Sequence, residues 1–208
     1  MALINNRHMS IFFHLYKCGG NSVRKVMPQG VELHGVHVAP TEILHHYKVH
    51  GKEDKFNEMF KFTFVRNPFN FLLSTFYYAT IFKNHFMHND IKGMDMDKFV
   101  PYYMKVVEEH KDPLVRPFGS NKVTTLFQYI SDKDGKVLVD YVGKLETINP
   151  DMKIVHAKLG IKPLSSPVPV VNKTKIKSGH YRKHYSPQAR KLVEKHFEKD
   201  LNYFNYEF

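Results

Sequence analysis

Hydrophobic and polar positions change period several times along the chain. Three short runs of apolar, β-branched and aromatic residues predict buried strands, at residues 10–15 (SIFFHL), 60–65 (FKFTFV) and 136–142 (KVLVDYV). Two glycines follow soon after the first run, and an Asn-Pro pair follows the second, which are residues that end a strand.

Helical patterns occupy the stretches between and after these strands. Pro40 suits the first position of a helix and Gly51 its end, and Ser186 with Pro187 predicts the start of the last helix. The predicted helices cover residues 22–27, 40–50, 69–82, 95–110, 150–159 and 187–200. Strands that alternate with helices predict an α/β fold in which helices flank a mostly parallel central sheet.

The composition fits one folded domain and an anionic partner. The length of 208 residues predicts a single domain over residues 1–208. Lys and Arg number 31 against 20 Asp and Glu, which gives a net charge of +11. The single cysteine, Cys18, excludes an intrachain disulfide and a Cys-rich zinc module. The apolar runs are too short for a transmembrane segment or a secretory signal, so we expect a cytoplasmic protein.

The first candidate site is the K-C-G-G-N-S segment between the first strand and its helix. Glycines allow close approach of the backbone to a phosphate, while Lys17 adds a charge and Ser22 a hydroxyl donor. The lysine precedes the glycines, so this is not the G-x-x-x-x-G-K-[ST] loop of ATPases and GTPases. A tight strand-to-helix turn with an incidental lysine is the alternative.

The second candidate site is the F-V-R-N-P-F-N-F-L-L-S segment at residues 64–74. Arg66 ends a predicted strand, where ligands bind in open α/β sheets, and Ser74 lies on the following helix. A guanidinium and a hydroxyl together suit a phosphate. The alternative is an arginine paired with a carboxylate and an ordinary helical serine.

Both segments resemble motifs of the Golgi-type carbohydrate sulfotransferases and their bacterial relatives (sulfotransferase family 2). H-L-Y-K-C-G-G-N-S at residues 14–22 is similar to their 5′-phosphosulfate loop, commonly H-I-P-K-T-G-G-T-S, and residues 64–74 are similar to their 3′-phosphate motif. The likeness continues in V-D-Y-V-G-K-L-E at 139–146 and H-Y-R-K-H-Y-S-P at 180–187. It therefore covers nearly the whole chain in order.

The resemblance implies a P-loop-like fold and sulfuryl transfer without a metal. The donor would be 3′-phosphoadenosine 5′-phosphosulfate (PAPS), the product adenosine 3′,5′-bisphosphate (PAP), and the acceptor a hydroxyl or amine of a small molecule or glycan; we expect a carbohydrate. The residues that would bind the donor are Lys17, Cys18, Gly19, Gly20, Asn21 and Ser22 at the 5′-phosphosulfate, and Arg66 and Ser74 at the 3′-phosphate.

The chain departs from the family pattern inside the first motif. Cys18 and Asn21 stand where threonine is common, and Leu15-Tyr16 where Ile-Pro is common. Backbone N–H donation survives these changes, while two side-chain hydroxyls are lost or replaced. Cys18 could be a reactive thiol, but we expect a small buried space-filler.

Catalysis needs a cation near the leaving oxygen and a base for the acceptor hydroxyl. We assign Lys17 to the bridging oxygen and His37 to the base, with His34 and Glu42 as alternatives between the two phosphate motifs. His14 could touch the substrate or pack beneath the loop.

Two further segments are candidates for ligand contacts. In the lysine-rich stretch before the last helix, we expect Lys173, Thr174 or Tyr181 to contact the nucleotide; a solvated basic loop, or one that receives an acidic glycan, is the alternative. Residues 79–119 are rich in aromatic side chains and histidine and are the expected acceptor region.

Three other functions compete with sulfuryl transfer. A protein of the same fold that binds the nucleotide without catalysis would keep the phosphate motifs and lose the acceptor site. The net charge also suits a nucleic-acid binder, but no nucleic-acid motif is present and we expect no such partner. A nucleotide kinase is disfavoured because the lysine of the ATPase loop is missing.

Overall fold

A computed structural model of the chain describes residues 2–28, 32–34, 37–109, 124–171 and 181–208. Within these ranges, five strands form one sheet in the order β3-β1-β2-β4-β5. The strands are β1 (Ala2–Asn5), β2 (Ser10–Phe13), β3 (Glu32–His34), β4 (Phe60–Val65) and β5 (Tyr141–Lys144). β4 pairs in parallel with β2 and β5, whereas β1 is antiparallel to both β2 and β3. Four strands therefore share one direction, which confirms the expected α/β fold with a mostly parallel sheet.

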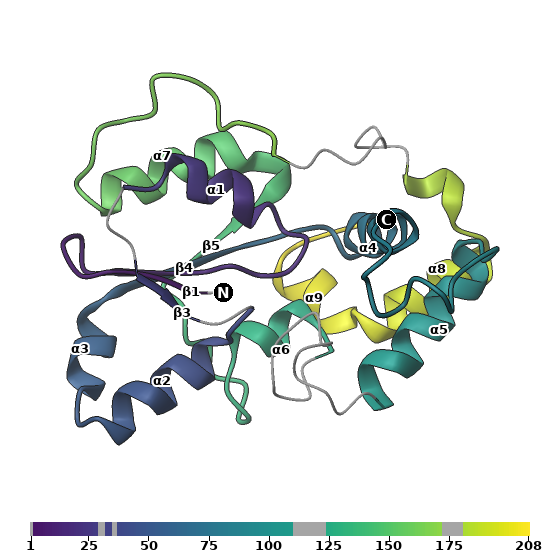
Figure 1. Ribbon diagram of the computed structural model, residues 1–208, viewed down its shortest axis with the longest axis horizontal. Helices are drawn as coiled ribbons and strands as arrows, with labels where there is room; N and C mark the ends of the chain where they lie inside the picture. The colour runs from purple at the N-terminus through teal and green to yellow at the C-terminus, as the bar shows by residue number, and fades with distance from the viewer. Residues whose placement is uncertain (1, 29–31, 35–36, 110–123, 172–180) are drawn as a thin grey trace.

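Helices surround this sheet (Figure 1). They are α1 (Gly20–Val26), α2 (Pro40–Val49), α3 (Glu53–Glu58), α4 (Pro68–Ile81), α5 (Met96–Glu109), α6 (Leu126–Ile130), α7 (Ile148–Lys158), α8 (Pro187–His196) and α9 (Glu198–Tyr203), with short 3₁₀ turns η1 (Leu145–Thr147) and η2 (Tyr181–His184). The six predicted helices are confirmed, although the last one is divided in two at Phe197.

The third predicted strand lies later in the chain than expected. Its first half is not in the sheet, because Val137 forms an isolated bridge with Ser131 and the Leu138 N–H donates to the carbonyl of Ile130. Strand β5 begins at Tyr141, directly after the Asp140 N–H donates to the Lys61 carbonyl of β4. The first part of residues 136–142 therefore pairs with the end of α6, and the last part pairs with β4.

The two faces of the sheet are covered by different helices. Phe12, Phe62 and Phe64 pack in a core with Val23 of α1 and Val155 of α7. The intervening residues of β2 and β4 face a larger core that includes residues of α2 and α4. Figure 1 shows α1 and α7 on one side of the sheet and α2 and α3 on the other. Burial on both faces explains why the strands are continuous apolar runs instead of alternating ones.

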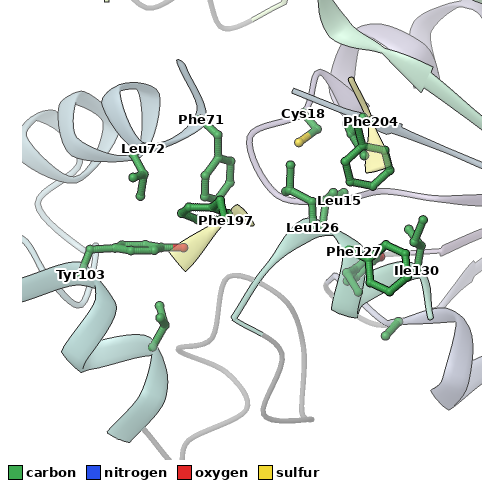
Figure 2. Packing of buried hydrophobic residues seen from close by; sticks show 14 of the residues in the cluster. Leu15, Cys18, Phe71, Leu72, Tyr103, Leu126, Phe127, Ile130, Phe197 and Phe204 are labelled. Atoms are coloured by element: carbon green, nitrogen blue, oxygen red, sulfur yellow. The ribbon is translucent and has the colours of Figure 1, made fainter. Parts of the chain in front are cut away.

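The larger core joins the sheet to a helical layer formed by α4, α5 and α8. Helix α4 is buried over most of its length. Figure 2 shows Phe71 of α4 beside Phe197, with Tyr103 of α5 nearby, and it shows Leu15 next to Leu126. This packing holds the start of α4 rigidly against the end of the sheet.

The end of β2 is the place where the connections diverge. After β2 the chain runs through α1 to β3, and after β4 it runs through α4 to β5, on the other side of the sheet order. Neighbouring parallel strands whose connections leave in opposite directions mark the usual ligand site of an open α/β sheet. The two candidate phosphate segments begin at these two strand ends.

Candidate functional site

The loop between β2 and α1 has a backbone that depends on glycine. Gly19 precedes α1 with a φ of 80°, in the left-handed region, and its carbonyl accepts from the N–H groups of Ser22 and Val23. A Cβ on Gly20 would overlap with the ring of His14. His14 thus packs beneath the loop, which is one of the two positions expected for it, and it leaves no room for a side chain at residue 20.

Two cations meet at this loop, one from each predicted motif. Arg66 follows β4, and its Nη1 donates to the backbone carbonyl of Lys17 at 3.4 Å. Within the described residues, neither side chain has a carboxylate within 4.0 Å, so the ion-pair alternative for Arg66 finds no partner there. Burial, and next the charge of Arg66, lower the pKa of Lys17 to about 8. Two neighbouring, half-buried cations with no ion pair among the described residues favour an anion beside them.

The Glu146 carboxylate lies near Arg66 but is already engaged. It accepts from the Asn67 N–H at 3.0 Å and from the Tyr206 hydroxyl at 2.9 Å. Burial lowers the pKa of Arg66, and Glu146 acts weakly in the opposite direction. Glu146 therefore holds the start of α4 in place next to Arg66, while the guanidinium stays available.

The serines of both motifs occupy helices beside the loop. Ser22 is buried in α1, and its Oγ accepts from the Val171 N–H at 3.1 Å, so its own hydrogen can still be donated. Ser74 is buried in α4. Asn21 is exposed in the first turn of α1. These positions agree with the predicted donor contacts, which remain predictions.

Cys18 and Tyr181, which were also predicted to contact the nucleotide, make contacts within the protein. Cys18 is buried in the core beside Phe204 (Figure 2), where burial raises the pKa of its thiol. Its N–H donates to the Leu15 carbonyl, so the structure gives Cys18 a packing role and no free donor. The Tyr181 ring stacks on Phe69, and its hydroxyl donates to the Glu207 carbonyl at 3.4 Å. Lys173 and Thr174 lie outside the described residues.

His37 is placed next to the loop in one defined tautomer. Its Nδ1 lies 2.9 Å from the His14 carbonyl oxygen. A carbonyl can only accept, so Nδ1 carries the hydrogen and, in the neutral ring, Nε2 is the basic atom. Burial lowers the pKa of His37 to about 4, which keeps the ring neutral near pH 7. Its φ of 52° is unusual for a residue with a side chain, a form of strain that clusters at functional sites.

The other two candidate bases are placed differently. Glu42 closes the capping box of α2, because its Oε2 accepts from the Ala39 N–H at 2.7 Å. The side chain of His34 lies outside the described part of the chain. Between His37 and Glu42, His37 is the candidate that contacts the phosphate motif, through the His14 carbonyl.

Three further residues lie near Lys17: Tyr78 and His85, which were expected among the acceptor contacts, and Tyr16, for which no role was predicted. The Lys17 ammonium lies 4.1 Å from the centre of the Tyr78 ring, and the Tyr16 hydroxyl oxygen lies 3.2 Å from Nε2 of His85. Tyr78 stacks on Phe82, which is 45% exposed. The available signals were the position of Tyr16 directly before Lys17 and the aromatic, histidine-rich character of the expected acceptor region.

Nowhere in the described ranges do three or more His, Cys, Asp or Glu side chains gather as a metal site would require. None of the helices in these ranges has the length and apolar character to cross a membrane.

The fold and the site define an α/β protein in which a glycine-containing loop between a parallel strand and its helix lies beside Lys17 and Arg66. The model of the sulfotransferase family matches residues 2–207, so the chain belongs to the sulfotransferase family. Carbohydrate sulfotransferase 10 of Xenopus laevis is 21% identical to it over an alignment of 251 positions, which covers 98% of this chain and 66% of the relative. The chain thus spans just under two thirds of that relative's length. No solved structure matches the chain significantly.

Proposed function

We propose that this protein is a PAPS-dependent sulfotransferase that acts on a hydroxyl, or an amine, of a carbohydrate. The observation that carries the proposal is the meeting of Lys17 and Arg66, which are 49 positions apart and come from separate motifs. Family membership supports a transferase, and the name of the matched relative supports a carbohydrate acceptor.

The residues present fit the two phosphate ends of the donor. Lys17 and the backbone of Gly19 and Gly20 would bind the 5′-phosphosulfate, together with Asn21 and Ser22. The first N–H groups of α1 have no acceptor within the helix, and a side chain on Gly20 would close the loop against His14. Arg66 and Ser74 would bind the 3′-phosphate.

His37 and Lys17 would divide the chemistry between a base and a charge stabiliser. PAPS supplies the sulfuryl group when it is bound. His37 Nε2 takes the proton of the acceptor hydroxyl while that oxygen forms its bond to sulfur. Lys17 stabilises the negative charge on the bridging oxygen, whose bond to sulfur breaks and which remains with PAP. The products are a sulfate ester, PAP and a protonated His37, which releases its proton to solvent.

The test is thermal unfolding with PAP, ATP and AMP, in the wild type and in Arg66→Ala. PAP at 100 times its Kd should stabilise the wild type by about 2.7 kcal/mol. We expect Arg66→Ala to lose this effect. The matched control is Arg190→Ala, because Arg190 lies on α8 in an exposed pair with Glu194 at 2.6 Å, and it should respond like the wild type.

The other results separate the competing functions. Equal stabilisation by all three nucleotides, or none by PAP, would contradict a PAPS site. PAP-specific stabilisation without transfer of radiolabelled sulfate from PAPS to a panel of glycans, steroids and phenols would favour the non-catalytic nucleotide-binding alternative. Circular dichroism confirms that Arg66→Ala is folded before its response is interpreted.

A further inference from the structure

The Tyr16 side chain is surrounded by groups from three other segments. Its ring lies edge-on to His37 at 5.3 Å between centres and to Tyr78 at 6.3 Å. Its hydroxyl oxygen lies 3.2 Å from Nε2 of His85, which comes from the stretch after α4. The proline that is common at this position in the family could not supply such a hydroxyl.

The hydrogen bonds of His85 determine where its proton lies. The Met87 N–H is a donor, and it lies 3.2 Å from His85 Nδ1, so Nδ1 accepts. Burial, and next the charge of Lys17, lower the pKa of His85 to about 4, so the ring is neutral near pH 7. A neutral imidazole that accepts at Nδ1 carries its hydrogen on Nε2.

It follows that the Tyr16 hydroxyl has a hydrogen left to donate. His85 Nε2–H donates to the Tyr16 oxygen, which leaves the hydroxyl hydrogen for another acceptor. In the ranges that the structure describes, no further hydrogen-bond partner of this oxygen is present. Burial raises the pKa of Tyr16, so the hydroxyl keeps this hydrogen at physiological pH.

This donor and the ammonium of Lys17 have the Tyr78 ring as a common neighbour. The Tyr78 ring is 4.1 Å from the Lys17 nitrogen, and its centre lies 5.6 Å from that of His85. The Tyr78 ring also lies next to the Tyr16 ring. Tyr16, Lys17 and His85 therefore all have the Tyr78 ring as a neighbour. A neutral O–H donor next to a cation suits an anionic oxygen.

We propose that the Tyr16 hydroxyl donates a hydrogen bond to a sulfuryl oxygen of PAPS, and that His85 is the positioning residue that orients it. This inference rests on the proposed function, because it assigns Lys17 to the same end of the donor. Because PAP lacks the sulfuryl group, loss of the Tyr16 hydroxyl should weaken the binding of PAPS and leave the binding of PAP unchanged.

The test is calorimetric titration of PAPS and PAP into the wild type, Tyr16→Phe and the matched control Tyr141→Phe. The Tyr141 hydroxyl donates to Asp151 at 2.8 Å. Tyr141→Phe therefore also removes a hydrogen-bonded tyrosine hydroxyl, but from β5. We expect Tyr16→Phe to bind PAPS about tenfold more weakly and PAP as the wild type does. Tyr141→Phe should leave both dissociation constants unchanged.

A pair of His85 variants tests the positioning role. His85→Ala removes the N–H that fixes the Tyr16 oxygen, and PAPS affinity should fall while PAP affinity is retained. His85→Gln can place an amide N–H near the position of Nε2 and should restore part of the PAPS affinity. A purely structural role would change PAP binding as well and would not be rescued by glutamine.

Three results would overturn the inference. An unchanged ratio of PAPS to PAP affinity in Tyr16→Phe would show that the hydroxyl does not contact the sulfuryl group. An equal loss for both nucleotides would make Tyr16 a residue that only shapes the loop. A wild type that binds neither nucleotide would instead contradict the proposed function itself, together with the inference built on it.

Discussion

Lys17 and His37 share a backbone conformation that residues with side chains seldom adopt. Their φ angles are 55° and 52°, both in the left-handed region. Tertiary hydrogen bonds hold both: Arg66 donates to the carbonyl of Lys17, and His37 itself donates to the carbonyl of His14. Hydrogen bonds to neighbouring residues thus keep the two predicted catalytic residues in strained backbone conformations.

The low pKa of Lys17 makes a prediction about nucleotide binding. A lysine with a pKa of about 8 is charged at pH 7 and largely neutral at pH 9, so the affinity for PAP should fall by up to about tenfold across this range. The phosphate groups, with a second pKa near 6, stay ionised throughout. Titration calorimetry at pH 7, 8 and 9 measures the change.

Lys17→Arg is the control for that prediction. A guanidinium keeps its charge to pH 9, so the affinity of the variant should vary little with pH. A decline of the same size in Lys17→Arg would show that some other group titrates.

At the scale of helices and strands, capping groups close in the sequence set several of the boundaries. Asn67 accepts from the Phe69 N–H at the start of α4, and Ser186 accepts from the Ala189 N–H at the start of α8. These caps act within a few residues, so the sequence contains them in full. The short helices α3 and α6 were not predicted, because fewer than two turns display no helical period.

Ser186→Ala should lower the free energy of unfolding by about 1 kcal/mol, because it removes the side-chain acceptor of the Ala189 N–H. Urea unfolding monitored by circular dichroism measures this loss. Ser186→Asp keeps an acceptor and should retain most of the stability. PAP affinity should be unchanged in both variants, and a change would indicate that α8 is coupled to the site.

Other element boundaries depend on contacts far along the chain. Asp200 caps α6, since its Oδ1 accepts from the N–H groups of Leu126 and Phe127 at 2.6 and 3.0 Å. Phe197 is fully buried between α8 and α9, where the predicted single helix is divided. Both features are set by packing in the larger core, and the residues next to them in the sequence do not reveal these long-range contacts.

For the whole molecule, buried histidines should determine stability in mild acid. Burial lowers the pKa of His14 to about 3, and that of His37 and of His85 to about 4. The unfolded chain binds protons at these residues near pH 6.5, and the folded chain does not, so stability is lost as the pH falls below 6.5. Asp200, with a pKa raised to about 6, acts in the opposite direction.

The net effect should be a loss of roughly 2–3 kcal/mol between pH 7.5 and pH 5.5, after discounting the part of the His85 shift that solvent screens. Urea unfolding at several pH values measures this dependence, and His85→Gln should make it shallower. Stability that stays constant or rises down to pH 5.5 would contradict it.

The sequence by itself determined the α/β class, the strands β2 and β4, the longer helices, and the two candidate phosphate segments that contain Lys17 and Arg66. These features depend on periodicity and on short-range backbone chemistry, which neighbouring residues specify. Only the tertiary structure decided that the two cations meet without an acid partner within the described residues, that Cys18 faces the core, and that Tyr16 pairs with His85. These depend on contacts between residues tens of positions apart, which packing and burial select and no local pattern displays.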